Sequence, residues 1–238
     1  MAETLEERLA KIVRFEAELL RKFPQFVQPQ SDMYVSHFLL FGALKRTLAH
    51  ADGFRKHIAD RNFICAGTIM RAQLDTALRV NALSLVKSPE QFASDVLAGK
   101  RIDKMKDANG HRLTDAHLAK KLSEQFPWVQ EVYDNLCDFG HFSNRHIFTS
   151  MTGADDATRT VSFQVSAKDP PRPDADYFEI VEGFFETMRI TGLLMAGLAQ
   201  ALQMRSAEYR RELPPAAQPS ETLKNQRTPR CGPRGSSF

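Results

Sequence analysis

One stretch of the sequence, residues 62–87 (NFICAGTIMRAQLDTALRVNALSLVK), limits the possible folds more than any other. At 100° per residue, apolar side chains cover most of the circumference of the helix that it would form. Phe63 and Leu74 share one side of that helix, while Ile64 and Val86 lie on much of the opposite side. A helix that is apolar nearly all round is normally surrounded by other helices. We therefore expect this helix to be the central element of a helical domain.

Three charged residues form a stripe along the same helix, at positions i, i+4 and i+8: Arg71, Asp75 and Arg79. At this spacing Asp75 can pair with the arginine on either side. Because the helix is expected to be largely buried, removing three charges from water requires further polar partners. We expect the rest of the chain to supply them.

The remaining sequence predicts mostly helices joined by short connections. Capping residues, prolines near the first helical position and apolar residues at helical spacing mark their starts and faces. The expected helices span residues 4–22, 31–60, 88–98, 114–125, 128–142 and 174–204. The fold class is therefore mainly α, a bundle of four to five long helices.

One segment has a different period. Val161, Phe163 and Val165 alternate with polar residues, and residues 153–156 (GADD) give a turn signal before them. Strict alternation around a turn predicts a β-hairpin, here at about residues 146–167, inserted into the helical body. We expect residues 1–204 to form a single domain, followed by a disordered basic tail over residues 205–238 in which no period survives.

The charge of the chain is concentrated in that tail. The net charge is +3, and seven basic and three acidic residues lie beyond Met204, so the tail carries +4 and the body −1. A body with this charge is not a nucleic-acid-binding surface through bulk charge, although a local patch is still compatible with it. The locally basic segment 100–121 also contains three aspartates, which favours a solvated surface over an RNA-binding patch.

The sequence predicts a cytoplasmic protein. Its three cysteines, Cys65, Cys137 and Cys231, are odd in number, far apart and without a CxxC motif, as in a reduced cytosolic chain. The N-terminal residues include acidic side chains where an export signal needs a basic start and an apolar run. The most apolar late segment, residues 190–202, is too short to span a membrane.

A second segment, residues 133–146 (YDNLCDFGHFSNRH), has the polar chemistry to meet the charged stripe. If its helix packs beside the central helix, the two supply a carboxylate, a phenol, an imidazole and a guanidinium. Such groups can bind an anion or move a proton near neutral pH. The candidate ligand-binding residues are Arg71, Asp75, Tyr133, His141 and Asn144, and the candidate catalytic residues are His141, Arg145 and His146.

Three interpretations of this cluster are open. The simplest is a buried polar network that fixes the register of the helices. The second is a ligand or catalytic site, because polar groups that converge in an apolar body often mark one. The third, a metal site made by Asp134, Cys137 and His141, needs only a pattern that arises easily by chance. We therefore expect no metal and no cofactor.

Taken together, Arg71 and Asp75 on a buried helix, followed some sixty residues later by Y-x-x-L-C-x-F-x-H and a hairpin, resemble a group of uncharacterised bacterial helical proteins. The resemblance covers about residues 35–200. The helical body of that group is in turn similar to HEPN domains, many of which are ribonucleases in toxin and phage-defence systems. The resemblance implies a HEPN-like bundle with a shared polar site, and it brings no established activity.

The nuclease signature of HEPN domains is an arginine, usually followed by a polar residue, and then a histidine after four to six intervening residues. Only Arg112 to His117 (RLTDAH) matches, with apolar Leu113 in the polar position and the pair at the start of a helix. A motif this short matches by chance, so catalysis is not assigned to it. P-loop, GxGxxG, HExxH and GxSxG patterns are absent from the sequence.

Two hypotheses for the function follow. The first is a non-catalytic helical protein that binds a small ligand or a protein partner, with the polar cluster as a structural network or the wall of a pocket. The second is a HEPN-like, metal-independent ribonuclease, for which RNA is the substrate and a homodimer forms the cleft. In that case His141 or His146 is the acid or base, and Arg71 or Arg145 stabilises the phosphorane.

Overall fold

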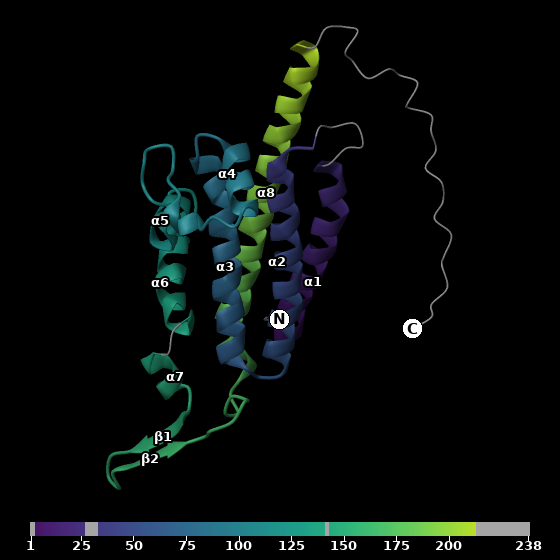
Figure 1. Ribbon diagram of the computed structural model, residues 1–238. Coiled ribbons are helices and arrows are strands. Elements are labelled where there is room, and N and C mark those ends of the chain that lie inside the picture. The colour runs from purple at the N-terminus through teal and green to yellow at the C-terminus, as the bar shows by residue number, and fades with distance from the viewer. Residues whose placement is uncertain (1–2, 27–32, 141–142, 213–238) are drawn as a thin grey trace, which may run out of the picture.

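The computed structural model describes residues 3–26, 33–140 and 143–212 of the chain. Long helices dominate it: α1 (Leu5–Lys22), α2 (Val35–Ala59), α3 (Phe63–Leu85) and α8 (Phe178–Glu212). Figure 1 shows these four helices side by side. The prediction of a mainly α chain with a β-hairpin is confirmed. None of the described helices is long and apolar enough to cross a membrane.

Helix α3 has the central position that its sequence predicts. It packs against α2, α8 and three shorter helices: α4 (Pro89–Leu97), α5 (Asp115–Ser123) and α6 (Trp128–Gly140). Its side chains are therefore buried on nearly every side, and the fully buried ones include Leu74, Ala77 and Leu78. Burying apolar surface is worth roughly 25 cal/mol per Å², so this helix contributes a large share of the core.

Local signals define the ends of these helices. Thr4 forms a capping box with Glu7 at the start of α1, and the Asn62 side chain accepts a hydrogen bond of 3.0 Å from Cys65 N at the start of α3. At Gly67, α6 approaches α3 so closely that a Cβ atom would lie 2.5 Å from the ring of Phe139. A glycine is therefore required there for the two helices to pack.

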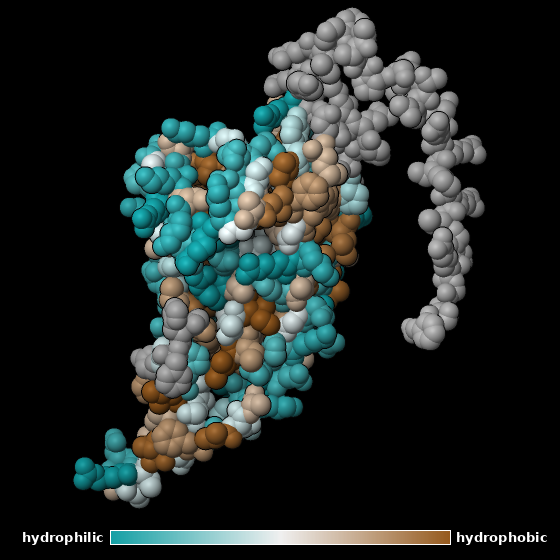
Figure 2. Space-filling model, viewed as in Figure 1, coloured by the Kyte–Doolittle hydropathy of each residue, from teal (hydrophilic) through white to brown (hydrophobic). Residues whose placement is uncertain are grey.

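The hairpin is shorter than predicted. Strands β1 (Met151–Asp155) and β2 (Thr160–Phe163) pair antiparallel, with an irregularity between Met151 and Gly153. The turn lies after Asp155 and not at residues 153–156. The Asp155 carboxylate accepts hydrogen bonds from the backbone N–H groups of Ala157 and Thr158, and Arg159 has φ +50°. Figure 2 shows apolar residues exposed along this part of the molecule.

Two further boundaries differ from the prediction. Residues 146–148, which were expected to begin the hairpin, belong instead to α7 (Asn144–Phe148). Ser143 N donates to His146 Nδ1 at 3.2 Å at the start of this helix. The last helix, expected to end at about Met204, continues to Glu212. Eight residues predicted as disordered tail are therefore helical, and residues 213–238 lie outside the described residues.

Candidate functional site

The charged stripe of α3 is the centre of an ion-pair network that draws partners from two other helices. Arg79 Nε donates to Asp75 Oδ1 at 3.0 Å, and Arg46 Nη1 of α2 lies 3.3 Å from Asp75 Oδ2. Arg71 turns to α5, where its Nη2 lies 3.1 Å from Asp115 Oδ2. Asp75 thus pairs with Arg79 and Arg46, whereas Arg71 pairs with Asp115.

Asp115 is the second anion of the network. Its Oδ1 also accepts a hydrogen bond from Arg79, so one carboxylate joins both ends of the α3 stripe. Arg79 Nη1 donates in addition to Leu113 O at 3.3 Å. The side chains of Arg71 and Arg79 are only 17% and 24% exposed, so these pairs are partly shielded from water. This arrangement anchors the start of α5 to the middle of α3.

Helix α6 contributes Tyr133, as predicted. The Arg71 guanidinium carbon lies 4.9 Å from the centre of the Tyr133 ring, within the range of a cation–π contact. Burial raises the pKa of the Tyr133 hydroxyl, and the neighbouring Cys137 raises it further. Tyr133 is therefore a neutral phenol at physiological pH. The structure brings Arg71, Asp75 and Tyr133 into one region around α3.

A chain of neutral polar groups continues from Arg46 into the core. His50 Nδ1 lies 2.9 Å from Gln73 Oε1, and the Gln73 amide donates to the hydroxyls of Thr47 and Thr191. Arg46 Nε donates to His50 Nε2 at 3.4 Å, which requires the neutral Nδ1–H form of this imidazole. Burial lowers the pKa of His50, which favours the same neutral form.

The remaining predicted residues are His141, Asn144, Arg145 and His146. His141 falls outside the described residues, and Asn144 and Arg145 belong to α7. His146 is half-buried, and its ring centre lies 6.2 Å from that of Phe139 at the end of α6, about two turns beyond Tyr133. It lines a small pocket of about 120 Å³ with residues of the segment 164–170. The structure therefore places His146 apart from the network of Arg71.

Two of the three residues considered as metal ligands, Asp134 and Cys137, have different partners on α6. Asp134 accepts a hydrogen bond from Gln130 at 3.1 Å, whereas Cys137 contacts Tyr133. His141, its third member, lies outside the described residues. Cys65 and Cys137 are both free thiols.

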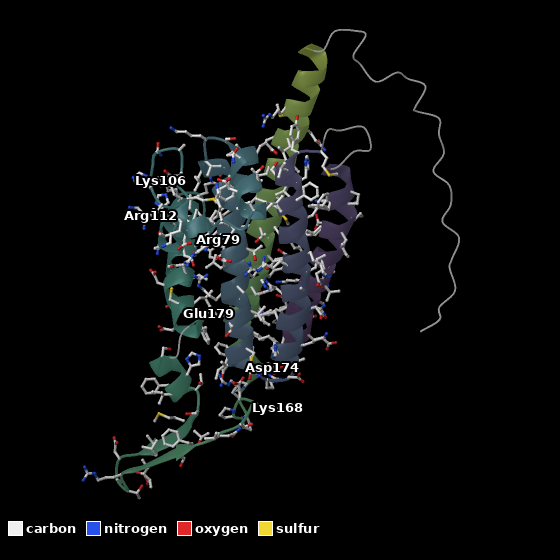
Figure 3. The ribbon with its side chains drawn as sticks, viewed as in Figure 1. Arg79, Lys106, Arg112, Lys168, Asp174 and Glu179 are labelled. Atoms are coloured by element: carbon white, nitrogen blue, oxygen red, sulfur yellow. The ribbon has the colours of Figure 1, made fainter. Side chains whose placement is uncertain are left out.

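A groove borders the network on the side of α4. It encloses about 350 Å³ between α2, α3 and α4, and Arg46 and Arg79 reach it at one end. Figure 3 labels Arg79, one of these two residues. The rest of the wall of the groove is almost entirely apolar and consists of Phe38, Leu39, Gly42, Ala43, Thr76, Val80, Leu83, Phe92, Val96, Leu97 and Ile102. The groove therefore combines an apolar floor with a cationic end.

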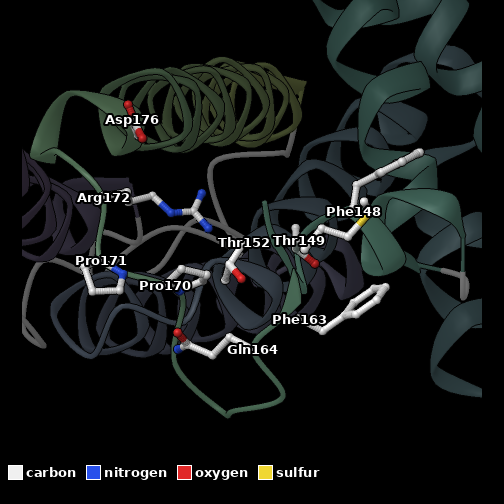
Figure 4. Close-up of a pocket in the computed structure, with 10 residues that line it drawn as sticks. Phe148, Thr149, Thr152, Phe163, Gln164, Pro170, Pro171, Arg172 and Asp176 are labelled. Atoms are coloured by element: carbon white, nitrogen blue, oxygen red, sulfur yellow. The ribbon is translucent and has the colours of Figure 1, made fainter. Parts of the chain in front are cut away.

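A larger hollow of about 910 Å³ lies at the base of the hairpin, between Phe148, Phe163 and the segment 170–172 (Figure 4). Its charged members are Arg172 and Asp176. Arg172 is already engaged, because its Nη2 lies 3.5 Å from Asp169 Oδ1 and its guanidinium lies against the rings of Phe63 and Tyr177. The wall of the hollow also contains Thr149, Thr152 and Gln164, so the hollow is more polar than the groove.

Sequence reasoning missed Arg46 and Asp115 as members of the network. Asp115 lies 44 residues from Arg71, and Arg46 lies 29 residues before Asp75, so local spacing has no signal for either pair. Only the requirement that a buried charged stripe needs partners pointed to residues of this type.

No known protein-family model matches the sequence, and neither a curated protein nor a solved structure matches it. The resemblance to HEPN domains therefore stays a prediction.

Proposed function

We propose that the protein is a cytoplasmic, non-catalytic binding protein built on a bundle of four to five long helices. We further propose that its ligand is a small carboxylate with an unbranched apolar chain. The ligand lies in the groove between α2, α3 and α4, with its carboxylate against Arg46. The observation that supports this is a cationic network at the end of an otherwise apolar groove. An apolar pocket with a few convergent polar groups is the usual form of a ligand site.

The charge of the network favours an anion. It contains three guanidinium groups, those of Arg46, Arg71 and Arg79, and two carboxylates, those of Asp75 and Asp115, which leaves one positive charge in excess. Arg46 is the most exposed of the three arginines, with 46% of its side chain accessible. Because a guanidinium binds a carboxylate with two parallel hydrogen bonds, Arg46 can hold a ligand anion while it still contacts Asp75.

Binding of three eight-carbon compounds, octanoate, octanol and octylammonium, tests this proposal by calorimetry. Octanoate should bind at least about tenfold more tightly than octanol, and octylammonium should bind most weakly, because the charge-assisted hydrogen bond is worth about 1.5–3 kcal/mol. Each added CH₂ group in the series hexanoate, octanoate, decanoate should strengthen binding by up to about fourfold, the equivalent of about 0.8 kcal/mol. Equal affinity for octanoate and octanol would contradict the role of Arg46.

The substitution Gly42→Leu separates binding from stability. Gly42 lines the groove within α2, and a Cβ atom there would meet no atom within 4 Å, so the variant should fold normally and fill the groove. It should lose octanoate binding. Gly197→Leu is a matched control on α8, where a Cβ atom also meets nothing and which lies outside the groove. If Gly42→Leu binds octanoate like the unaltered protein, the ligand is not in this groove.

The HEPN-like ribonuclease is the second candidate. The observation that favours it is His146, a half-buried imidazole in a small pocket whose lining includes Asn62, Ser150 and Lys168. Its test is cleavage of several RNAs without added metal, compared with a His141→Ala, His146→Ala double variant whose fold is checked by circular dichroism. Cleavage that the variant loses would replace the binding proposal with the nuclease. Cleavage at the variant's background level would exclude the nuclease.

A further inference from the structure

A second polar cluster lies in the loop before α5, outside the network around Asp75. Its three members are Asp107, His111 and His117. One donor atom from each lies within 4.8 Å of the other two: a carboxylate oxygen and two imidazole nitrogens. His117 Nε2 is 2.9 Å and His111 Nδ1 is 3.4 Å from the same oxygen, Asp107 Oδ2.

The loop holds the carboxylate in a fixed orientation. Asp107 Oδ1 accepts hydrogen bonds from Asn109 N at 2.9 Å and His111 N at 2.8 Å, which directs Oδ2 toward the two imidazoles. The side chain of Asp107 is only 3% exposed. The loop therefore sets the position of the Oδ2 atom between the two histidines and shields it from bulk water.

Two backbone features bring the histidines to this carboxylate. Gly110, with φ +90°, turns the chain so that Asp107 N donates a hydrogen bond to His111 O at 2.8 Å. The backbones of Lys106 and Arg112 form an antiparallel β-bridge where the loop begins and ends. Figure 3 shows Lys106 and Arg112 at the outer edge of the molecule. The Thr114 hydroxyl caps α5 by accepting a hydrogen bond from His117 N, which sets His117 in the first turn. The rigid loop and the helix start therefore present three ligands to one point.

We infer that Asp107, His111 and His117 bind a divalent transition-metal ion of the zinc type. Imidazole nitrogens and a carboxylate oxygen are ligands that Zn²⁺ accepts at about 2.0–2.2 Å, which at tetrahedral angles places neighbouring donor atoms about 3.3–3.6 Å apart. The 3.4 Å separation of His111 Nδ1 from Asp107 Oδ2 lies within this range, and the 2.9 Å separation of His117 Nε2, a hydrogen bond, would lengthen when a metal enters. His117 would exchange its hydrogen bond to Asp107 for a bond from the Nε2 lone pair to the metal.

The site is open on one side. His117 is 18% exposed and His111 is 64% exposed, so the coordination positions beyond the three protein ligands face solvent. Three protein ligands with an open fourth position are typical of zinc sites that hold a water or an exogenous ligand. The nearby Lys121 pairs with Glu124 at 2.8 Å, which neutralises a cation that would otherwise repel the metal.

The test is direct binding of Zn²⁺ and Co²⁺ to the full chain, purified without a polyhistidine tag. The unaltered protein should bind one equivalent of either ion, and its X-ray absorption spectrum should show nitrogen and oxygen ligands with two imidazoles. His111→Gln should weaken binding at least about tenfold, since even the loss of a residue that only supports a ligand weakens binding 10–100-fold. Because His111 is largely exposed, this variant should fold normally.

Two further variants keep the test decisive. Asp107→Asn preserves an acceptor for the backbone N–H groups and removes the charged ligand, so it should weaken binding at least as much as His111→Gln. His57→Gln, a substitution on α2 outside the cluster, is the control and should bind Zn²⁺ like the unaltered protein. Failure of the unaltered protein to bind either ion would overturn the inference. So would a sulfur ligand in the absorption spectrum, or binding that His111→Gln and Asp107→Asn leave unchanged.

Discussion

Asp115 and Asp107 lie eight residues apart, and each holds a carboxylate between two nitrogen-bearing side chains. Asp115 lies between two arginines, whose guanidinium groups are permanently charged and have no lone pair to donate. Asp107 lies between two histidines, each of which can offer a lone pair when neutral. The same geometry therefore gives ion pairs in one place and groups that can ligate a metal in the other.

The difference also concerns what each cluster connects. The Asp115 network ties α5 to the central helix through side chains that are far apart in the sequence. The Asp107 cluster is confined to a loop and the first turn of α5, within eleven residues. The Asp115 pairs therefore tie α5 to the central helix, whereas the Asp107 cluster is open to solvent at His111.

The largest expected effect is the loss of Asp115. Asp115→Asn should lower the free energy of unfolding by about 2–3 kcal/mol, because it leaves Arg71 and Arg79 without their shared anion. This value lies below the range for a fully buried ion pair, since the Asp115 side chain is 33% exposed. Urea denaturation measures the loss. Asp103→Asn is the control, since Asp103 pairs with the exposed side chains of Arg101 and Lys104. It should cost less than about 1 kcal/mol. Equal losses of unfolding free energy in the two variants would show that the ion pairs of Asp115 contribute no more than the exposed pairs of Asp103.

Zinc should separate the two clusters. At a free concentration a hundredfold above its Kd, Zn²⁺ should raise the free energy of unfolding by about 2.7 kcal/mol. The Asp115→Asn variant should gain the same increment, because its metal ligands are intact. The His117→Gln variant should gain almost none. Denaturation with and without Zn²⁺ tests this, and a missing increment in Asp115→Asn would show that the two clusters act as one.

Arg79→Lys should have an intermediate effect. Arg79 donates to Asp75, Asp115 and Leu113 O at once, and a lysine ammonium cannot reproduce this fork. We expect a loss of about 1–2 kcal/mol, comparable to one or two hydrogen bonds. Binding of Zn²⁺ should be unchanged. A stability equal to that of the unaltered protein would mean that charge alone, without geometry, holds the network together.

The smallest expected effect is a pH dependence at the edge of the Asp115 network. Burial lowers the pKa of His50 in the folded state below its value of about 6.5 in the unfolded chain. The unfolded state therefore binds the proton more readily, so the contribution of His50 is complete above pH 6.5 and declines as the pH falls below it. Urea denaturation from pH 7.5 to 5 should show a steeper decline for the unaltered protein than for His50→Gln. Parallel curves would exclude His50 as the cause.

The central helix was predictable because its constraint is local. A stretch that is apolar all round has to be buried all round, and residues 62–87 contain that information by themselves. The predicted partners of the charged stripe were only partly right. Tyr133 does contact Arg71, but Asp115 and Arg46 are brought to α3 by tertiary packing. No spacing rule connects residues so far apart.

The Asp107 cluster, in contrast to the partners of the charged stripe, had a local signal in the sequence. The Asn109-Gly110 turn returns His111 to Asp107, and the Thr114 cap fixes His117 in the first helical turn. The sequence alone favoured a solvated basic surface for this segment, and the expectation of no metal there stays a prediction. The hairpin boundaries differ from the prediction because local hydrogen bonds fix the structure on either side of β1. Ser143 N donates to His146 Nδ1 at α7, and the Asp155 carboxylate accepts from Ala157 N at the turn.

The most direct measurement is the ¹⁵N spectrum of the histidine imidazoles during a titration with Zn²⁺. We expect His117 Nε2 and His111 Nδ1 to change from their metal-free shifts to those of metal-bound nitrogens at one equivalent. His50, the imidazole beside the Asp75 network, should stay unchanged with its proton on Nδ1. Unchanged shifts at His111 and His117 through the titration, or a first response at His50, would contradict the contrast drawn between the two clusters.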